Sequence, residues 1–464
     1  MRSPSTIEPR EAPSADSGPP SLHQEPTLPR LLAGIPAQGA MHLHEHLAIH
    51  GELPSSPRRR RGPSPLIEQI GRAGLRGRGG AGFPTATKMR AVESAKGRPI
   101  VLANAAEGEP ASLKDLTLIH SLPHLVLDGG VLAAQAVGAD EVILCVCESL
   151  EAHVLDGLAR AIEERRAMRS ERGADRLPRL RLMTVPQHYV AGQESALVNH
   201  LNGGPAMPTF TPPLPFERGV ARRPTLINNA ETLAHIALIA RHGAQWFRQL
   251  GVAAQPGSTL VTLSGPVAAP GVYEIEYGAS LSSLIDAAGG ATGRVLGALL
   301  GGYAGSWIGA EHMHGVVLSD EHLAPLGTSL GAGVVLLLSD EACPVAETAR
   351  VARWLAGQST GQCGPCVNGL AALADTVEEV AGGVAQDEAT RRIAALAALV
   401  RRRGACAHPD GAVNFILSSI ATFAPEFSDH ARHGPCDACA RTGELPLPVP
   451  PPRPTSRPTP AGLR

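Results

Sequence analysis

The stretch LRGRGGAGFPT, residues Leu75–Thr85, is the most informative segment of this 464-residue chain. It contains glycines in G-x-G-x-x-G spacing with cations close by, namely Gly77, Gly79, Gly82, Arg76, Arg78 and Lys88. Glycines let a backbone approach a phosphate closely, and cations neutralise the phosphate's charge. A helical stretch (IEQIGRAG) precedes the loop, where a dinucleotide fingerprint demands a strand, and no Gly-Lys-Ser/Thr ends it. The loop alone is therefore equally consistent with a glycine-rich surface turn.

Outward from this loop, the sequence predicts an α/β fold. Apolar runs at Ile100–Leu102, Glu141–Val146 and Leu180–Val185 have strand character, and helical stretches such as Ala152–Arg166 separate them. Strands that alternate with helices predict a mostly parallel sheet. We expect this α/β domain to cover residues 64–250.

Two further regions follow. Residues 257–338 begin with short β-rich runs, split by Gly-Pro and Pro-Gly turns, and an amphipathic helix, which predicts a small separate β-rich domain. Residues 340–432 are rich in alanine at helical spacing, which predicts a helical bundle interrupted by a cysteine-bearing turn.

Both ends of the chain are rich in proline. Of 41 prolines, 11 lie in residues 1–63 and 8 in residues 440–464, so we expect both segments to be disordered tails. Four histidines of the first tail surround Glu45, namely His42, His44, His46 and His50. Alternating histidines without cysteine form a polar face more often than a metal site.

Composition narrows the class of protein. With 43% hydrophobic residues, 18% charged residues and a formal net charge of −2, the chain has an ordinary globular balance, which argues against nucleic acid as the main partner. Eight cysteines without an apolar leader favour a reducing cytoplasm over a secreted disulfide framework. The longest apolar stretches fall short of the roughly 20 residues that a membrane span needs, so any membrane association would come through partners.

Four ordered motifs point to a family. GLRGRGGAGFPT, Asn104–Asp115 (NAAEGEPASLKD), Tyr189–Leu197 (YVAGQESAL) and Pro224–Ala234 (PTLINNAETLA) resemble the flavin- and NADH-binding subunit of respiratory complex I, with related subunits in soluble hydrogenases and formate dehydrogenases. The resemblance covers roughly residues 66–430. It implies an FMN-binding α/β domain, a small β-grasp domain and a C-terminal helical bundle that carries an iron-sulfur site.

The resemblance also implies roles for individual residues. The glycine loop and Lys88 would lie by the phosphate and ring of FMN, and Glu107 and Glu194 are the candidate catalytic residues because a carboxylate near the flavin can position a nicotinamide. Without the resemblance, turn capping explains Asn228 and Asn229 equally well, and Glu107 is interpreted as a solvated acid. The implied cofactor-binding residues are Gly77, Arg78, Gly79, Gly80, Gly82, Phe83, Lys88, Asn104, Tyr189, Gly192, Asn228 and Asn229.

The chain departs from the family pattern where a nicotinamide would bind. Ala106 and Gln193 stand where the family has carboxylates, and of three adenine-stacking aromatic positions only Phe83 remains, with Ala91 and Leu214 at the other two. Stacking contributes roughly 1 to 3 kcal/mol per base, so we expect NADH to reduce the flavin weakly or not at all.

The cysteines show a similar departure. The family has Cys-x-x-Cys-x-x-Cys with a distant fourth cysteine, whereas this chain has Thr360-x-x-Cys363-x-x-Cys366 with Cys406. Since a 4Fe-4S cluster is normally held by four thiolates, three of them predict a 3Fe-4S cluster or a four-iron cluster with an unusual ligand such as the Thr360 oxygen. The C-x-x-C pair Cys436–Cys439 is an alternative source of the fourth thiolate, and it also fits zinc or a disulfide.

Two hypotheses about function follow. In the first, a flavin-dependent oxidoreductase subunit passes electrons from a reduced donor, NADH by resemblance, through FMN to an iron-sulfur cluster and on to other electron-transfer subunits. In the second, the chain is an electron-transfer or scaffold module that has lost NADH oxidation and takes electrons from a ferredoxin-like partner.

Overall fold

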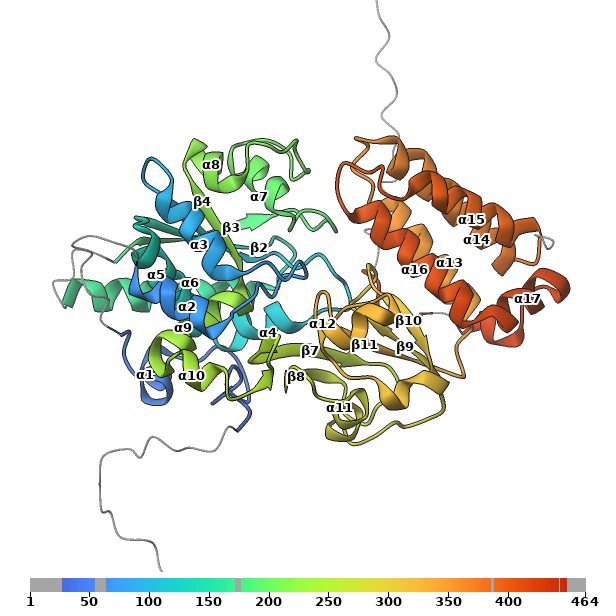
Figure 1. Cartoon of the computed structure of the whole chain (residues 1–464), viewed down its shortest axis with the longest axis horizontal. Coiled ribbons are helices and arrows are strands. Elements are labelled where there is room, and N and C mark those ends of the chain that lie inside the picture. Colours follow the sequence, from blue (N-terminus) through green and yellow to red (C-terminus); the bar gives the residue numbers. More distant parts are fainter. Residues whose placement is uncertain (1–26, 55–63, 172–176, 385–387, 442, 449–464) are drawn as a thin grey trace, which may run out of the picture.

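The computed structural model describes residues 27–54, 64–171, 177–384, 388–441 and 443–448 (Figure 1). Its first region is built on a four-stranded sheet of order β3-β2-β1-β4, in which every neighbouring pair is parallel. The strands are β1 (Ile100–Ala105), β2 (Glu141–Cys147), β3 (Arg179–Val185) and β4 (Thr225–Asn229). The predicted parallel α/β sheet is confirmed.

Helices cover both faces of this sheet. On one face, Val101 and Val142 join the core formed with α5 (Pro123–Val137) and α9 (Ala230–His242), and the alternate residue Leu102 packs toward α7 (Glu194–Leu201) on the other face. Burial on both faces explains why the strands are continuous apolar runs in the sequence. The other helices of this region are α2 (Pro65–Ala73), α3 (Thr85–Ser94), α4 (Lys114–Ser121), α6 (Ala152–Glu171), α8 (Pro215–Arg218) and α10 (Ala244–Phe247).

Helices α5 and α9 approach closely because of one glycine. A Cβ at Gly129 of α5 would lie 1.8 Å from the carbonyl oxygen of Leu233 in α9. Since real atoms cannot approach so closely, any side chain at this position would push the two helices apart. This contact sets how α9, and therefore the end of β4 that precedes it, is placed relative to β1.

The first tail is shorter than predicted. Residues 27–54 are packed onto the α/β region and include α1 (Leu43–His50). Leu31 and His46 are fully buried, and His46 Nε2 lies 2.8 Å from Asp128 Oδ2. The expectation of disorder is wrong for this segment, because its apolar residues complete the core. The rest of residues 1–63 lies outside the described residues.

The second region contains a five-stranded mixed sheet of order β10-β9-β11-β7-β8. Strand β11 (Val334–Ser339) is parallel to β7 (Ser258–Ser264), and all other pairs are antiparallel. The remaining strands are β8 (Gly271–Glu276), β9 (Val295–Leu300) and β10 (Ser306–Gly309), and helices α11 (Leu281–Ala287) and α12 (Asp320–Leu323) accompany them. A parallel first and last strand between two hairpins is the arrangement expected of a β-grasp fold. The hairpin β5 (Gly251–Val252) and β6 (Gln255–Pro256) precedes this sheet.

The third region is the predicted helical bundle (Figure 1). Its helices are α13 (Pro344–Gly357), α14 (Ala371–Ala381), α15 (Glu388–Val400), α16 (His408–Thr422) and α17 (Ala424–His433). A π-helical turn, η4 (Pro365–Leu370), interrupts the bundle between α13 and α14 and contains Cys366. Such turns occur frequently at functional sites.

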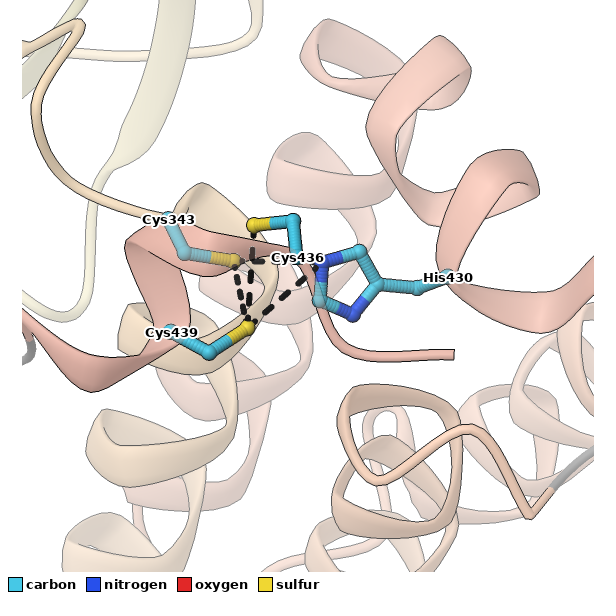
Figure 2. Close-up of side chains that lie close together, drawn as sticks. All are labelled: Cys343, His430, Cys436 and Cys439. Atoms are coloured by element: carbon cyan, nitrogen blue, oxygen red, sulfur yellow. Dashed lines mark hydrogen bonds between the residues drawn. The ribbon is translucent and has the colours of Figure 1, made fainter. Parts of the chain in front are cut away.

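The segment after α17 packs back onto the bundle. Cys436 and Cys439 lie against Cys343 and His430 (Figure 2), and Leu445 is buried. The predicted proline-rich tail is therefore wrong for residues 443–448, and residues 449–464 lie outside the described residues.

The length and composition of the helices bear on membranes. Among the described residues, no single helix combines the length and apolar character of a membrane span, and α4 with α5 passes on length and composition only as a pair bent by 95°.

Candidate functional site

A cavity of about 480 Å³ lies at the carboxyl ends of β1 and β4, next to the glycine loop. This is the edge where open α/β sheets bind ligands, and the volume lies in the range of small-molecule sites. The β-grasp region contributes Gly301–Gly305 and Gly331 to its wall, and the bundle contributes Ala407. Eight of the residues predicted from the sequence line it: Arg78, Gly79, Gly80, Asn104, Glu107, Tyr189, Gly192 and Asn229.

The other predicted residues lie around this cavity. Gly77 and Gly82 line a smaller neighbouring cavity of about 30 Å³. Lys88 forms an ion pair with Glu194 and donates to the Ile227 carbonyl at 3.1 Å. Asn228, Phe83, Lys88 and Glu194 are absent from the lining of the large cavity, as far as the described chain defines it.

Arg78 has a different role from the one predicted. Its backbone N–H donates to Thr232 Oγ1 at 2.9 Å, and its guanidinium donates to the Ser258 carbonyl at 3.1 Å and lies 4.6 Å above the ring centroid of Tyr277. The side chain is 4% exposed. Its charge therefore supports the junction with the second sheet, and only its backbone follows the glycine loop along the cavity.

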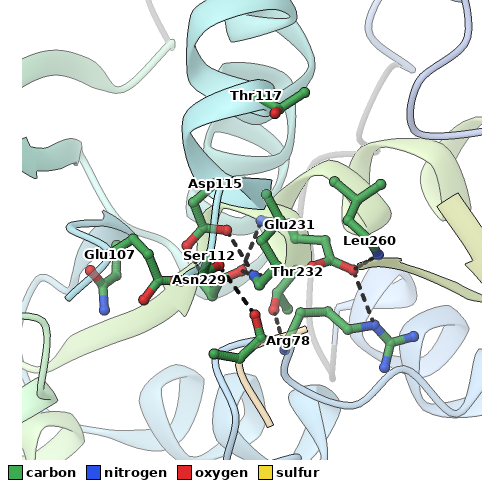
Figure 3. A network of polar contacts seen from close by, with 12 residues as sticks. Arg78, Glu107, Ser112, Asp115, Thr117, Asn229, Glu231, Thr232 and Leu260 are labelled. Carbon is green, nitrogen blue, oxygen red and sulfur yellow. Dashed lines mark hydrogen bonds and ion pairs between the residues drawn. The ribbon is translucent and has the colours of Figure 1, made fainter. Parts of the chain in front are cut away.

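Lys114 is the buried cation at the cavity, within a network of charges (Figure 3). Its Nζ lies 2.8 Å from Asp115 Oδ1, 3.1 Å from Glu231 Oε2 and 3.4 Å from Asn229 Oδ1. Burial alone would lower the pKa of Lys114, but Asp115 and Glu231 raise it well above its ordinary value. The ammonium group therefore stays charged at any ordinary pH.

Glu231 connects this network to the second sheet. Its Oε1 accepts hydrogen bonds from Thr259 Oγ1 at 2.8 Å and from the backbone N–H of Leu260 at 3.0 Å (Figure 3). Burial alone would raise the pKa of Glu231, but Lys114 holds it at about 2. A permanently ionised carboxylate in α9 thus ties the start of β7 to the wall of the cavity.

Asn229 both caps a helix and lines the cavity. Its Oδ1 accepts the backbone N–H of Glu231 at 2.9 Å, as an N-cap of α9, and its Nδ2 donates to Asp115 Oδ2 at 2.5 Å. The capping explanation considered from the sequence is therefore correct for this residue, and it coexists with a position in the cavity.

Two carboxyl groups at the cavity are protonated near neutral pH. Burial raises the pKa of Glu109 to about 8, and loss of hydration followed by the charge of Asp115 raises the pKa of Glu107 to about 7. Glu109 Oε2 accepts the backbone N–H of Tyr303 at 2.8 Å and the hydroxyl of Tyr189 at 3.3 Å. These acids can therefore hold or release a proton beside a bound cofactor.

Aromatic contacts link the cavity to the bundle. The ring centroid of Tyr189, a cavity residue, lies 5.4 Å from that of Trp354 and 5.3 Å from that of His408. His408 begins α16, and Ala407 just before it lines the cavity. The cysteine Cys406 is therefore one residue from the cavity wall.

The structure brings together the three cysteines predicted as cluster ligands. Burial, with smaller contributions from the Cys363 and Cys406 thiols, raises the pKa of Cys366 to about 12. Cys363 lies in the turn after α13, Cys366 in η4 and Cys406 just before α16. Thr360, the fourth predicted ligand, directs its Oγ1 to Gln362 Oε1 at 3.0 Å, so its hydroxyl is engaged with a neighbour in the same turn.

The C-x-x-C pair lies at the other end of the bundle. Cys439 Sγ is 3.5 Å from the sulfur of Cys343, the residue that precedes α13, whereas Cys363 follows the last turn of that helix. Since α13 has 14 residues, its ends are separated by about 21 Å. The structure therefore does not place Cys436 or Cys439 as the fourth ligand of the Cys363 group.

Sequence comparisons identify each of the three regions. Residues 70–238 match the Nuo51 FMN-binding domain, residues 260–297 the SLBB domain, and residues 346–430 the NADH-ubiquinone oxidoreductase-F iron-sulfur binding region. The NADH-quinone oxidoreductase-F protein from Streptomyces coelicolor is 32% identical over 375 residues, which cover 79% of this chain and 83% of the relative. The chain belongs to the NADH-quinone oxidoreductase-F family.

Other members of this family and a solved structure agree. The NADH-quinone oxidoreductase-F protein from Escherichia coli is 32% identical over 378 residues, covering 79% of this chain and 84% of that protein. A chain of an NAD⁺-reducing [NiFe]-hydrogenase, solved in the H₂-reduced state, superposes with a TM-score of 0.74 at 33% identity over 79% of this chain. This chain spans 62% of the length of that hydrogenase chain. It therefore carries the FMN-binding domain and the iron-sulfur region of the NADH-quinone oxidoreductase-F family.

Sequence reasoning missed several residues of the site. Lys114, Asp115 and Glu109 lie in the quoted NAAEGEPASLKD motif, where a Lys-Asp pair after two glutamates was the available signal. Glu231 lies in the quoted LINNAETLA motif. The contributions of Gly301–Gly305 and Gly331 had no local signal, because only the docking of the second sheet brings them to the cavity.

Proposed function

We propose that this chain is the electron-entry subunit of an NADH-dependent oxidoreductase, taking two electrons at FMN in the 480 Å³ cavity and delivering them singly to an iron-sulfur cluster. One observation carries the proposal. The cavity formed by the FMN-binding domain reaches the cysteine group of the iron-sulfur region, through Ala407 beside Cys406 and through the ring contacts of Tyr189.

The residues at the cavity fit FMN. Gly79 and Gly80 present backbone without side chains, and a Cβ at Gly79 would meet no atom closer than the Cβ of Asn229 at 3.4 Å. Asn104 and Asn229 place amide groups at the ends of β1 and β4, where a flavin's polar edge needs hydrogen-bonding partners. Lys114 supplies a fixed positive charge. FMN, when bound, accepts electrons in pairs and releases them one at a time.

Other residues of the chain prepare the site. Asn104 Nδ2 donates to the Gly192 carbonyl at 2.8 Å, which holds the two walls of the cavity together. Glu107 and Glu109 hold protons near pH 7 to 8, so each carboxyl can compensate a change of charge beside it. Cys363, Cys366 and Cys406 would hold the cluster as thiolates, with Thr360 at the position of the fourth ligand.

NADH is proposed as the donor from family membership, with weak binding. Phe83 is 49% exposed and free to stack on a base, whereas the exposed Leu214 offers no ring at the second position. The same loss favours the alternative function, an electron-transfer or scaffold module served by a ferredoxin-like protein. We further propose other electron-transfer subunits as partners, and any attachment to a membrane through them.

We also propose domain limits from this arrangement. The FMN-binding domain covers residues 64–250, the β-grasp domain residues 257–338 and the iron-sulfur domain residues 340–432. These limits place each of the three matched regions within one domain, apart from the flanking segments that pack onto them.

One experiment tests the proposal. The chain is purified without oxygen, its flavin and iron are measured, and the flavin absorbance is followed after NADH is added. Bound FMN that is bleached by NADH and reoxidised by a one-electron acceptor supports electron entry at this site. FMN and iron with no bleaching at millimolar NADH would favour the ferredoxin-linked module, and a folded chain that takes up no FMN would overturn both functions.

A further inference from the structure

Four metal-ligating side chains meet at the end of the bundle away from the cavity (Figure 2). Their four ligand atoms all lie within 4.8 Å of one another. The sulfur of Cys439 is 3.7 Å from that of Cys436 and 3.5 Å from that of Cys343. The Nε2 atom of His430 is 3.3 Å from the Cys343 sulfur and 3.7 Å from the Cys439 sulfur.

We propose that Cys343, His430, Cys436 and Cys439 bind a single zinc ion in a tetrahedral site. Zinc binds thiolate sulfur at about 2.3 Å and imidazole nitrogen at about 2.0 Å, so a tetrahedron places two sulfurs about 3.8 Å apart and a sulfur and a nitrogen about 3.5 Å apart. The observed separations lie close to these values. Three thiolates with one imidazole form a closed ligand set, which is typical of structural zinc.

Hydrogen bonds around the site orient its ligands. The Nδ1 atom of His430 lies 3.3 Å from the carbonyl oxygen of Ala381, which can accept only if Nδ1 carries the proton. This leaves Nε2, the atom that faces the three sulfurs, with a free lone pair for a metal. The backbone N–H of Ala346 points to the Cys343 sulfur at 3.4 Å, an arrangement that stabilises a thiolate at the start of α13.

The site is distinct from the iron-sulfur region. The family match to that region covers residues 346–430, which excludes Cys343, Cys436 and Cys439. The Cys363 group lies beyond the opposite end of α13. In addition, a cluster interposes several irons and sulfides between its ligands, whereas these four atoms are close enough to share one ion.

A disulfide explains the geometry less well. A bond between Cys436 and Cys439 requires about 2.05 Å between sulfurs that lie 3.7 Å apart, and it would leave Cys343 and His430 facing each other without a common partner. Burial raises the pKa of Cys343 to about 12, so without a metal this thiol would remain protonated beside two other sulfurs. A metal ion removes that proton and joins all four groups.

Zinc at this place would fasten the end of the described chain to the bundle. Just after Cys439, the carboxylate of Glu347 in α13 accepts the backbone N–H groups of Glu444 at 3.3 Å and Leu445 at 3.2 Å. The hydroxyl of Tyr303 then donates to the Pro446 carbonyl at 2.7 Å. The ion would therefore join α13, α17 and the C-terminal segment, and the segment would cover the core beside Tyr303.

The test measures metals in the full chain, purified anaerobically without a metal-affinity tag or chelator. Inductively coupled plasma mass spectrometry should find one zinc per chain in addition to iron. Cys436→Ser and His430→Gln should each lose at least nine-tenths of the zinc and keep the iron. The matched control His433→Gln, on an exposed residue of the same helix, should keep both metals. Cys363→Ser should lower iron and leave zinc at one per chain.

A spectroscopic arm holds even if a variant fails to fold. Cobalt offered to zinc-depleted parent protein should give the visible absorption of tetrahedral cobalt with thiolate charge transfer, and zinc should abolish it. The proposal is overturned if the folded parent neither contains zinc nor takes up cobalt. Zinc that persists in both His430→Gln and Cys436→Ser would also overturn it, as would a Cys436–Cys439 disulfide in the anaerobic preparation. Iron with acid-labile sulfide retained at this place in a Cys363→Ser, Cys406→Ser double variant would show a cluster instead of zinc.

Discussion

The side chain of Asn229 accepts the N–H of Glu231 at 2.9 Å and donates to Asp115 at 2.5 Å, so one amide both begins helix α9 and holds a buried acid beside the cavity. Lys114 lies against all three residues. This buried group joins the end of β4, the start of α4 and, through Glu231, the first strand of the β-grasp sheet. The geometry of the flavin cavity therefore depends on charges that must stay paired.

Replacing Lys114 with methionine should destabilise the protein strongly. The change leaves Asp115 and Glu231 buried without their cation, and breaking a buried ion pair in this way costs about 3 to 5 kcal/mol. The free energy of unfolding, measured in urea by circular dichroism, checks this value. Lys96→Met is the control, because Lys96 is exposed and should change stability by less than about 0.5 kcal/mol. A loss below about 1 kcal/mol for Lys114→Met would show that the network is not needed for folding.

Gly79→Leu should abolish FMN uptake while the chain still folds. The Cβ itself is tolerated, since it meets only the Cβ of Asn229 at 3.4 Å, but the remaining atoms of leucine would enter the cavity. Flavin content after incubation with excess FMN is measured by absorbance and chromatography. Gly271→Leu, at a strand position with open space around it, should bind FMN like the parent. Full flavin content in Gly79→Leu would place FMN elsewhere.

Glu109 should make stability depend on pH. Its pKa rises from an ordinary value near 4.5 to about 8 in the folded chain, so the folded state binds the proton more tightly than the unfolded state. Its contribution is therefore fully present below about pH 4.5 and is lost as pH rises to about 8. Glu109→Gln, which stays neutral, should gain stability relative to the parent over this range.

Unfolding midpoints between pH 5 and 9 test this difference. Glu321→Gln, at an exposed glutamate, should keep the parent's slope. Parallel curves for the parent and Glu109→Gln would show that the buried carboxyl does not titrate in this window.

Leu214→Phe should improve the use of NADH. Leucine occupies one of the positions where the family stacks the adenine, and one stacked ring contributes roughly 1 to 3 kcal/mol. A gain of about 1.4 kcal/mol corresponds to about a tenfold lower KM for NADH, with kcat little changed. Stopped-flow bleaching of the flavin band over a range of NADH concentrations gives both constants. Val384→Phe adds an exposed ring on the bundle and serves as the control. Rapid bleaching of the parent at micromolar NADH would show that the missing rings do not matter.

The sequence predicts the sheet and the bundle well because their signals are local. Alternating strands and helices mark the parallel sheet, and the order of four motifs marks the family. The ordered packing of residues 27–54 was missed because proline content outweighed a few apolar residues such as Leu31 and Met41, whose burial depends on the rest of the core. Composition describes a segment's average, whereas burial depends on single side chains.

The site was predictable only in part, for a similar reason. Glycines and asparagines of the cavity lie in contiguous motifs, so sequence order reveals them. By contrast, Cys343 precedes Cys439 by 96 residues, and nothing near Cys343 suggests that it faces His430. Only the packing of α17 against α13 creates that group, and the sequence therefore left the role of the Cys436–Cys439 pair open.

The last prediction concerns Thr360 and the iron-sulfur cluster. Its hydroxyl donates to Gln362, and a neutral hydroxyl is a far poorer ligand for iron than a thiolate. Protein prepared without oxygen should therefore hold iron and sulfide through Cys363, Cys366 and Cys406, with one iron site labile. Electron paramagnetic resonance should show a three-iron signal after mild oxidation.

Thr360→Cys restores the family's fourth thiolate and should convert this signal to that of a stable four-iron cluster, with iron rising from about three to about four per chain. Thr422→Cys places a thiol at the far end of α16 and is the control, because it should leave the three-iron signal unchanged. A four-iron cluster already stable in the parent would mean that another group completes it. Iron at full level in a Cys363→Ser, Cys366→Ser variant would mean that these thiols only shape the turn, because a cluster cannot persist on Cys406 alone.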